Sequence, residues 1–487
     1  MRIGFDNEKY QRIQSEHIKE RISQFDGKLY LELGGKLFDD HHASRVLPGF
    51  LPDSKLRMFQ KISDSIEIVI VISAADIEKN KKRADLGITY DEDVLRLRGE
   101  FQNRGFMVGS VVITHYNGQP AATQFKQRLE RDGIKTYCHY LIEGYPHDVK
   151  LIASDEGFGK NDYVETERPL VIVTAPGPGS GKMAVCLSQL YNENKRGIRA
   201  GYAKFETFPV WNLPLKHPVN IAYEAATADL NDVNMIDPFH LEAYNKIAIN
   251  YNRDIEIYPV LNALFEGIYG ANPYKSPTDM GVNMVGFCIS DDEACCEASK
   301  DEIIRRYYAA TNKMARGACN EAEISKIQIL FNQAGITTDY RRTTTAAKER
   351  LKETGHTSSA IELEDGTIIT GSSSELLGCS AALLLNVMKH LAGIDHQLKL
   401  IPQSMIEPIQ HTKIQYLGGH NPRLHTDEVL VALSVLSEND DNCRKALGQL
   451  PKLRGCQVHC TVMLSEVDQK IFKKLGVNST CEPVLKK

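Results

Sequence analysis

A glycine-rich segment near residue 180 combines residue types that bind phosphate. Leu170–Thr174 is an apolar run typical of a buried strand, and the sequence PGPGSGK follows it at residues 176–182. Residues 183–191 then carry apolar side chains at helical spacing. In such a strand, loop and helix, backbone N–H groups and the helix N-terminus attract phosphate, and a lysine can reach it. We therefore predict a phosphate- or nucleotide-binding loop, whose ligand-binding residues are Gly177, Gly179, Ser180, Gly181 and Lys182.

The loop departs from the phosphate-loop pattern G-x-x-x-x-G-K-[ST] at two positions. Pro176 replaces the first glycine, and with Pro178 it removes N–H donors and stiffens the turn. Met183 replaces the hydroxyl residue that would bind Mg²⁺, so either Ser180 or an outside carboxylate holds the metal, or the site needs none. The alternative interpretation is a tight turn that leaves Lys182 in solvent. A dinucleotide pattern G-x-G-x-x-G fails, because its last glycine falls on Lys182.

A second group of reactive side chains follows the first predicted strand. It consists of Asp39, Asp40, His41, His42 and Arg45. Carboxylate, imidazole and guanidinium groups at this density suit acid–base catalysis or anion binding, so we predict catalytic residues here. Adjacent side chains point in different directions, so His41 and His42 cannot both face one ion, and no metal site is predicted.

A third group is predicted to bind substrate. Lys204 lies with Trp211 in what looks like the exit of a strand. Thr278, Asp279 and Asn283 belong to a loop rich in Pro and Gly, of a length that is often functional. The alternative for this loop is a turn that satisfies its own polar groups.

These groups require an α/β scaffold. Over the first 250 residues, short β-branched apolar runs alternate with helix-length segments, which is typical of a parallel sheet covered by crossover helices. The strands are predicted at residues 29–33, 66–73, 108–114, 170–174 and 220–223, and the clearest helix at 124–132. We expect an N-terminal α/β domain at 1–235 that contains the phosphate-loop-like motif, a mostly helical region at 236–334, and a C-terminal mixed α/β subdomain at 335–487.

The C-terminal subdomain has its own pattern of elements. Residues 359–371 predict a hairpin, because Asp365-Gly366 is a turn signal between two alternating runs. A long apolar helix follows at 375–394, then a helical stretch from Thr426 to Leu450. A strand near 457–464, a helix at 466–476 and a short terminal strand complete the subdomain.

Composition excludes several classes of protein. The chain has 487 residues, of which 42% are hydrophobic and 25% charged, as in a globular protein of about three domains. A net charge of −5 argues against sequence-independent nucleic-acid binding. No apolar stretch is long enough to span a bilayer, and the charged N-terminus and 11 cysteines without a disulfide framework fit a reducing compartment. We expect a cytoplasmic protein without a nucleic-acid or membrane partner; a homo-oligomer is left open.

Four segments of the chain carry a family resemblance: YLELGGKLFDDHHASRVLPGF, TAPGPGSGKMAVCLSQLY, SPTDMGVNM and GGHNPRLHTDE. Together they resemble a bacterial family catalogued as domain of unknown function eighteen forty-six, over essentially the whole chain. The resemblance implies a cytosolic bacterial protein with an N-terminal α/β portion, a helical insertion and a C-terminal α/β subdomain, and it brings no activity. It also implies that the Pro-rich loop and Met183 are family features, which weakens the case for standard ATP hydrolysis.

The leading hypothesis is an enzyme that binds a nucleotide or another phosphorylated small molecule at the loop. Kinase-like or ligase-like transfer, by a phosphotransferase or an ATP-dependent ligase, is the most economical reaction class. The candidate cofactors are ATP or another nucleotide, with Mg²⁺. Zinc is not expected, because Cys456 and Cys460 alternate with His459 across a strand, and Cys295-Cys296 fits buried helix positions. The alternatives are a non-catalytic nucleotide- or metabolite-sensing protein and a structural protein with an empty loop.

Overall fold

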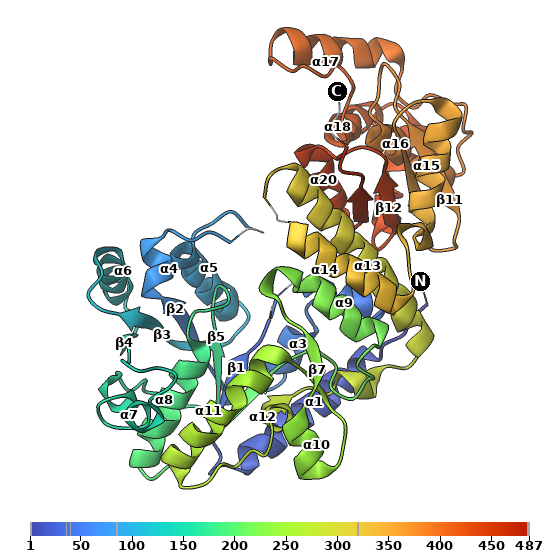
Figure 1. The fold of residues 1–487 in the computed structure, drawn as a ribbon. Helices are drawn as coiled ribbons and strands as arrows, with labels where there is room; N and C mark the ends of the chain where they lie inside the picture. Colours follow the sequence, from blue (N-terminus) through green and yellow to red (C-terminus); the bar gives the residue numbers. More distant parts are fainter. Residues whose placement is uncertain (1, 36, 39, 84–85, 319–320, 485–487) are drawn as a thin grey trace. The chain divides into compact units, whose positions relative to one another are not determined.

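The computed structural model describes residues 2–35, 37–38, 40–83, 86–318 and 321–484 (Figure 1). The chain divides into two compact units. The N-terminal unit comprises Arg2–Glu224 and Asn231–Cys296, and the C-terminal unit comprises Ala225–Leu230 and Glu297–Lys487.

A seven-stranded sheet forms the centre of the N-terminal unit, with the strand order β4-β3-β2-β5-β1-β6-β9. All of its neighbouring strands are parallel. The strands are β1 (Leu29–Leu33), β2 (Ile66–Ser73), β3 (Met107–Tyr116), β4 (Thr136–Tyr140), β5 (Leu170–Thr174), β6 (Gly201–Phe205) and β9 (Gly281–Val282). Two further strands, β7 (Asn234–Ile236) and β8 (Ile249–Tyr251), form a separate antiparallel pair. The predicted α/β fold class is confirmed.

Helices cover both faces of this sheet, which is why β2 and β5 are buried at every residue. On one face, Ile68, Ile70 and Ile72 of β2 pack with side chains from the α1, α3, α4, α5 and α6 segments. On the other, Val69 and Val71 pack with side chains of α8 and α11. The helices of this unit are α1 (Asn7–Ser23), α2 (His41–Val46), α3 (Ser54–Gln60), α4 (Ala74–Glu78), α5 (Tyr90–Gln102), α6 (Pro120–Arg131), α7 (Val149–Ile152), α8 (Lys182–Lys195), α9 (Pro218–Ala226, whose last two residues belong to the C-terminal unit), α10 (Pro238–Tyr244), α11 (Asn252–Tyr269) and α12 (Pro277–Met280).

The order of the strands creates a topological switch point. From β1 the chain steps over β5 to β2 and continues to β3 and β4, whereas from β5 it steps over β1 to β6. The connections that leave the neighbouring strands β2 and β5 therefore run towards opposite edges of the sheet. In doubly wound sheets, ligands bind in the crevice outside the carboxyl ends of the strands at such a point. The glycine-rich loop begins there, at the end of β5.

One predicted strand is wrong, and several strands of this unit were not predicted. Residues 220–223 lie in the helix α9, not in a strand. Pro218 begins this helix, where its missing N–H is harmless, and a short apolar run fits a helix as well as a strand. The strand β4 was not predicted, because its sequence TYCHY has little apolar character. The strands β7, β8 and β9 were not predicted either, since two or three residues carry too short a pattern to be recognised.

The C-terminal unit is built around a four-stranded mixed sheet with the order β11-β10-β12-β13. Its strands are β10 (Ser358–Glu362), β11 (Ile368–Ser372), β12 (Gln457–Cys460) and β13 (Asn478–Cys481), and only β12 and β13 pair in parallel. The predicted hairpin is β10–β11, and Gly366 in its turn has a φ of 82°. The helices are α14 (Glu321–Ala334), α15 (Arg342–Thr354), α16 (Cys379–Leu391), α17 (Gln403–Gln415), α18 (Thr426–Leu436), α19 (Asp441–Leu447) and α20 (Glu466–Lys474), while α13 (Asp292–Ala315) begins in the N-terminal unit.

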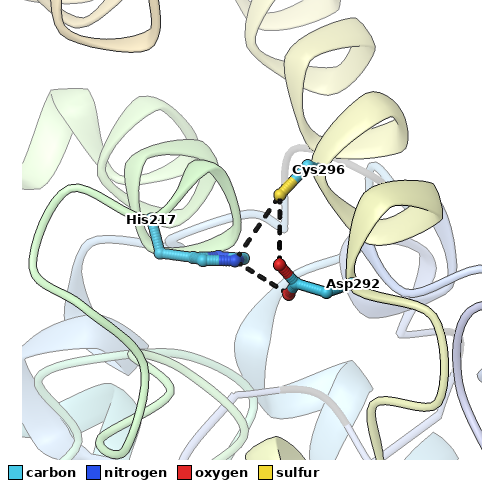
Figure 2. Close-up of side chains that lie close together, drawn as sticks. All are labelled: His217, Asp292 and Cys296. Carbon is cyan, nitrogen blue, oxygen red and sulfur yellow. Dashed lines mark hydrogen bonds and ion pairs between the residues drawn. The ribbon is translucent and has the colours of Figure 1, made fainter.

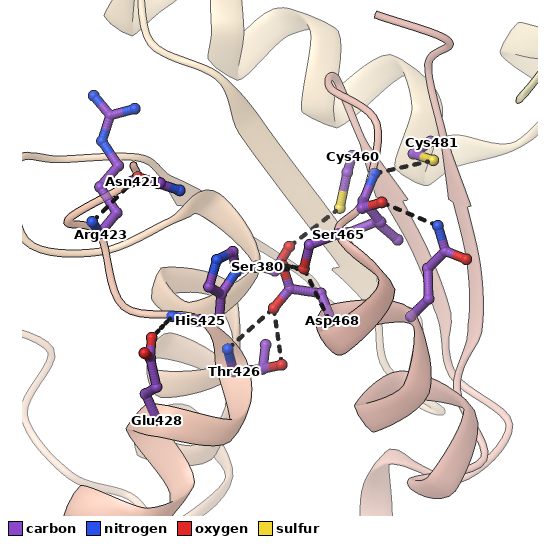
Figure 3. Close-up of polar contacts among 12 residues, drawn as sticks. Ser380, Asn421, Arg423, His425, Thr426, Glu428, Cys460, Ser465, Asp468 and Cys481 are labelled. Atoms are coloured by element: carbon purple, nitrogen blue, oxygen red, sulfur yellow. Dashed lines mark hydrogen bonds and ion pairs between the residues drawn. The ribbon is translucent and has the colours of Figure 1, made fainter. Parts of the chain in front are cut away.

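Asp468 connects the first turns of α18 and α20 (Figure 3). The backbone N–H and the hydroxyl of Thr426 donate to its Oδ1 at 3.0 and 2.9 Å, and the Ser465 hydroxyl donates to Oδ2 at 2.8 Å. His425 Nδ1 lies 3.2 Å from Oδ2. Burial by itself raises the pKa of this carboxyl, but these hydrogen bonds outweigh burial and lower the pKa of Asp468 to about 2.

In the described ranges, no helix combines the length and apolar character needed to cross a membrane.

Candidate functional site

The predicted strand, loop and helix are present as β5, residues 175–181 and α8. Gly179 and Gly181 have φ values of 75° and 88°, a left-handed conformation that favours glycine. Gly181 is the N-cap residue of α8, and no side chain within the described ranges caps the helix. N–H groups of its first turn are therefore available to a ligand.

Ser180 and Lys182 add side-chain groups to this loop. The Ser180 hydroxyl is buried, and no described residue forms a hydrogen bond with it. The backbone carbonyl of Ser180 has a partner, because Thr114 Oγ1 donates a hydrogen bond to it at 2.7 Å. The Lys182 ammonium group forms no ion pair with any described residue. The loop thus offers a hydroxyl and a cation that have no partner among the described residues.

Neighbouring elements enclose the loop. A Cβ atom at Gly177 would lie 2.3 Å from the hydroxyl of Tyr90, so the ring of Tyr90 excludes any other residue there. Lys81 Nζ lies 4.9 Å from the centre of that ring. His115, at the end of β3, is exposed with a φ of 50°, and its Nδ1 lies 3.3 Å from the hydroxyl of Ser73 at the end of β2.

A buried carboxylate lies on the strand next to β5. Glu32 of β1 is in register with Val173 of β5, close to the carboxyl ends of both strands. The Tyr202 hydroxyl donates to Glu32 Oε2 at 2.7 Å. An outside carboxylate is one of the Mg²⁺ ligands that the loop sequence left open, and Glu32 is a candidate for it. Sequence reasoning missed Glu32, because it lies inside an apolar run and its pairing with β5 is long-range.

The predicted substrate residues Thr278, Asp279 and Asn283 come together around a cavity of about 190 Å³. Glu206 and Trp211 line the same cavity. It lies beside the carboxyl end of β6 and beside β9, since Glu206 directly follows β6 and Asn283 directly follows β9.

The polar groups of these three side chains already have partners. Thr278 Oγ1 donates to Asp237 Oδ2 at 2.7 Å, and the Tyr244 hydroxyl donates to Asp279 Oδ2 at 3.0 Å. Asn283 Nδ2 donates to two backbone carbonyl groups at 3.2 and 3.1 Å. These hydrogen bonds hold the three side chains in place in the wall of the cavity.

Lys204 does not line the cavity. Its buried ammonium group instead forms ion pairs with two neighbouring carboxylates. It lies 2.5 Å from Asp254 Oδ2 and 2.9 Å from Glu206 Oε1, and it also donates to the Tyr251 hydroxyl. Burial is the largest influence on Glu206 and, with the nearby charge of Asp254, raises its pKa to about 7 against the attraction of Lys204. The raised pKa brings Glu206 closer to neutral pH, as suits a general acid or base. Sequence reasoning missed Glu206, although it stands two residues after Lys204.

The predicted catalytic cluster is only partly described, because Asp39 lies outside the described residues. Asp40 caps α2 by accepting from the N–H of Ala43 at 3.1 Å, and buried Lys55 pairs with it at 2.7 Å. Burial alone raises the pKa of Asp40, but the pairing with Lys55 brings it below the ordinary value.

His41 is exposed, whereas the ring of His42 packs edge-on against Phe208, with 5.0 Å between ring centres. Arg45 is partly buried, and none of these three cluster residues lines the cavity.

A separate group was not recognised in the sequence. His217, Asp292 and Cys296 converge within the N-terminal unit, from the turn before α9 and the first turns of α13 (Figure 2). The spacing of Asp292 and Cys296 places both on one helix face, but nothing in the sequence links them to His217.

Comparisons with known proteins match the whole chain. The family described as Domain of unknown function DUF1846, N-terminal, matches residues 3–335, and its C-terminal counterpart matches residues 339–487. The chain is 58% identical over 482 residues to a UPF0371 protein of Corynebacterium urealyticum and 56% identical over 483 residues to one of Corynebacterium aurimucosum. It is 55% identical over 480 residues to a UPF0371 protein of Streptococcus thermophilus. Each match covers 99% of this chain and 97% of the relative.

Proposed function

This chain belongs to the DUF1846 family, and from its geometry we propose that it binds a nucleotide or another phosphorylated small molecule at residues 177–182. The observation that carries the proposal is the start of α8. There a helix N-terminus without a side-chain cap adjoins Ser180 and Lys182, whose side-chain polar groups have no partner in the part of the chain that the structure describes. It lies at the topological switch point of a doubly wound sheet, where such folds bind ligands.

The phosphate would be held by complementary charge. N–H groups at the start of α8 and the ammonium group of Lys182 offer positive charge, and Ser180 offers a hydroxyl. Ser180 compensates for Met183, which has no hydroxyl for Mg²⁺, and Glu32 supplies a carboxylate from the neighbouring strand. The two prolines limit the number of N–H donors, so recognition depends more on Lys182 than in the standard loop.

For the reaction, we propose kinase-like or ligase-like transfer to an acceptor in the cavity lined by Glu206. Adjacent strands lie about 4.8 Å apart, so the ends of β5 and β6, with β1 between them, lie about 10 Å apart. Glu206 stands beside the turn after β1, since a Cβ atom at Gly34 would lie 3.4 Å from its Cγ. With a pKa of about 7, Glu206 is the group proposed to accept the proton of the acceptor.

The test is thermal unfolding of the full chain with ATP, GTP, pyrophosphate and sugar phosphates, each with and without Mg²⁺. A ligand at 100 times its Kd stabilises the folded state by about 2.7 kcal/mol. Lys182→Ala should lose this response. Lys195→Ala is the matched control, because Lys195 ends the same helix and pairs with Asp155 at its surface.

The outcomes separate the candidate functions. Stabilisation lost only in Lys182→Ala, together with Mg²⁺-dependent turnover of the bound ligand, supports the enzyme. The same binding without turnover favours a sensing protein. If no phosphate ligand stabilises the wild type, or both variants respond like the wild type, the loop is a structural turn and the proposal is wrong.

A further inference from the structure

Three side chains of different chemistry converge from two parts of the sequence. His217 Nε2 lies 2.9 Å from Asp292 Oδ1 and 3.5 Å from Cys296 Sγ, and Cys296 Sγ lies 3.9 Å from Asp292 Oδ2 (Figure 2). The imidazole is largely buried, the thiol is partly buried, and the carboxylate is exposed. All three residues belong to the N-terminal unit.

From this arrangement we propose that His217, Asp292 and Cys296 bind an exchangeable divalent metal ion of the zinc class. Tetrahedral zinc, with bonds of about 2.3 Å to sulfur and about 2.0 Å to nitrogen or oxygen, places its ligand atoms about 3.3 to 3.5 Å apart. The three observed separations bracket this range, so small side-chain rotations centre one ion among the three donors.

The donor set selects the type of metal. A thiolate and an imidazole favour Zn²⁺, Co²⁺ or Fe²⁺, whereas Mg²⁺ and Ca²⁺ prefer oxygen ligands only. Three protein ligands leave the fourth tetrahedral position to water or another small ligand, as in open zinc sites. The exposure of the Asp292 side chain, 62%, gives the ion a path from solvent.

The second nitrogen of His217 explains why the ion should be exchangeable. The N–H of Val219 donates to Nδ1 at 3.2 Å, so in the metal-free protein the ring proton resides on Nε2 and points at Asp292. Coordination through Nε2 moves this proton to Nδ1 and breaks the Val219 hydrogen bond. High-affinity zinc sites instead have an acceptor for the proton on the second ring nitrogen. This site lacks that support, so it binds the ion less tightly than a permanent structural site.

The proposed metal site does not involve the phosphate loop. It departs from the sequence analysis, which expected no zinc. Asp292 and Cys296 stand one turn apart at the start of α13, and His217 precedes α9. An ion shared by them fixes the start of α13 to the turn before α9.

Cobalt titration of the untagged full chain tests the proposal. One equivalent of Co²⁺ should produce a thiolate-to-cobalt charge-transfer band in the near ultraviolet and visible bands typical of tetrahedral cobalt. Zinc should displace the cobalt and abolish both. Cys296→Ser should lose the charge-transfer band and weaken zinc binding by about a hundredfold or more, because even loss of a ligand's hydrogen-bond partner costs ten- to hundredfold.

Cys295→Ser is the matched control. Its thiol is the neighbour of Cys296 in sequence but is buried and donates to the carbonyl of Gly4, so this variant should bind cobalt like the wild type. His217→Gln should weaken binding while leaving the charge-transfer band at saturating cobalt. Far-ultraviolet circular dichroism establishes that each variant is folded.

Alkylation of the wild type provides a measurement that needs no variant. Zinc should protect Cys296 from iodoacetamide, as read by mass spectrometry of its peptide, and leave the labelling of the other cysteines unchanged. Absence of a charge-transfer band in the wild type, an equal band in Cys296→Ser, or equal labelling of Cys296 with and without zinc would each overturn the proposal. The three residues would then be an ion pair beside an ordinary thiol.

Discussion

Replacing Asp468 by Asn should destabilise the C-terminal unit by about 2.5 kcal/mol at neutral pH. The carboxylate accepts hydrogen bonds from the first turns of both α18 and α20 (Figure 3). Its pKa of about 2, against an ordinary value of 3.8, measures how strongly the folded state prefers the ionised form. Each pKa unit between these two values corresponds to about 1.4 kcal/mol, which gives about 2.5 kcal/mol in total.

The sign of the pH dependence follows from the lowered pKa. Asp468 contributes its full stability above the pKa of the unfolded chain, and this contribution is lost as the pH falls through the folded-state value of about 2. The wild type and Asp468→Asn should therefore differ most at neutral pH, and the difference should narrow as the pH falls from about 5 towards 2.

Native-state hydrogen exchange measures this effect locally. Peptides covering α18 and α20 should exchange about sixtyfold faster in Asp468→Asn, since about 1.4 kcal/mol is a factor of ten. Asp441→Asn is the control: Asp441 also begins a helix, but its side chain is 78% exposed and pairs with Arg444 at the surface. The reasoning is refuted if both variants exchange alike, or if the deficit of Asp468→Asn persists undiminished at the lowest pH.

Two further substitutions test the N-terminal unit. Gly181→Ala places a side chain on a residue with a φ of 88°, with its Cβ 3.1 Å from a methyl group of Thr114. It should lower the free energy of unfolding by about 1 to 2 kcal/mol. It should also abolish the stabilisation by pyrophosphate in thermal unfolding. Gly197→Ala, at a φ of 79° beyond the other end of α8, should lower the free energy of unfolding by a similar amount but keep the pyrophosphate response. If both variants respond to pyrophosphate equally, the loop is not part of the binding site. Lys204→Met leaves the acids beside it without their cation, so it should destabilise the unit by about 3 to 5 kcal/mol and raise the pKa of Glu206 above about 7, as measured by denaturation and by carboxyl NMR titration. A loss below about 1 kcal/mol would contradict the assigned ion pairs.

The sequence contains enough information to predict the centre of the fold. Continuous β-branched runs such as residues 66–73 are recognisable because both faces of the strand are buried. Residues 220–223 show the limit of that signal, since four residues do not distinguish a strand from a helix, and the proline at the start of α9 decides for the helix. The sequence of β4 is too polar to be recognised as a strand. This strand lies at the sheet edge because it pairs with β3.

The candidate site was predictable only where its residues are contiguous. The loop around Gly181 follows from local spacing, and the positive φ values agree with the need for glycine there. Glu206 required knowledge that Lys204 is buried and that Asp254, on another helix, lies against it. The partnership of His217 with Cys296 depends on tertiary packing alone, which a single sequence does not encode in any local pattern.

The position of β1 in the middle of the sheet has a consequence for synthesis on the ribosome. Both of its partners, β5 and β6, come from residues 170–205, well over one hundred residues later in the chain. At about 5 to 20 residues per second, roughly 7 to 28 s pass after the synthesis of Leu29–Leu33 before the first partner, β5, has been translated. Throughout that interval a largely apolar strand has both of its edges unpaired. Nascent chains of this form are bound by chaperones and aggregate when chaperones are scarce.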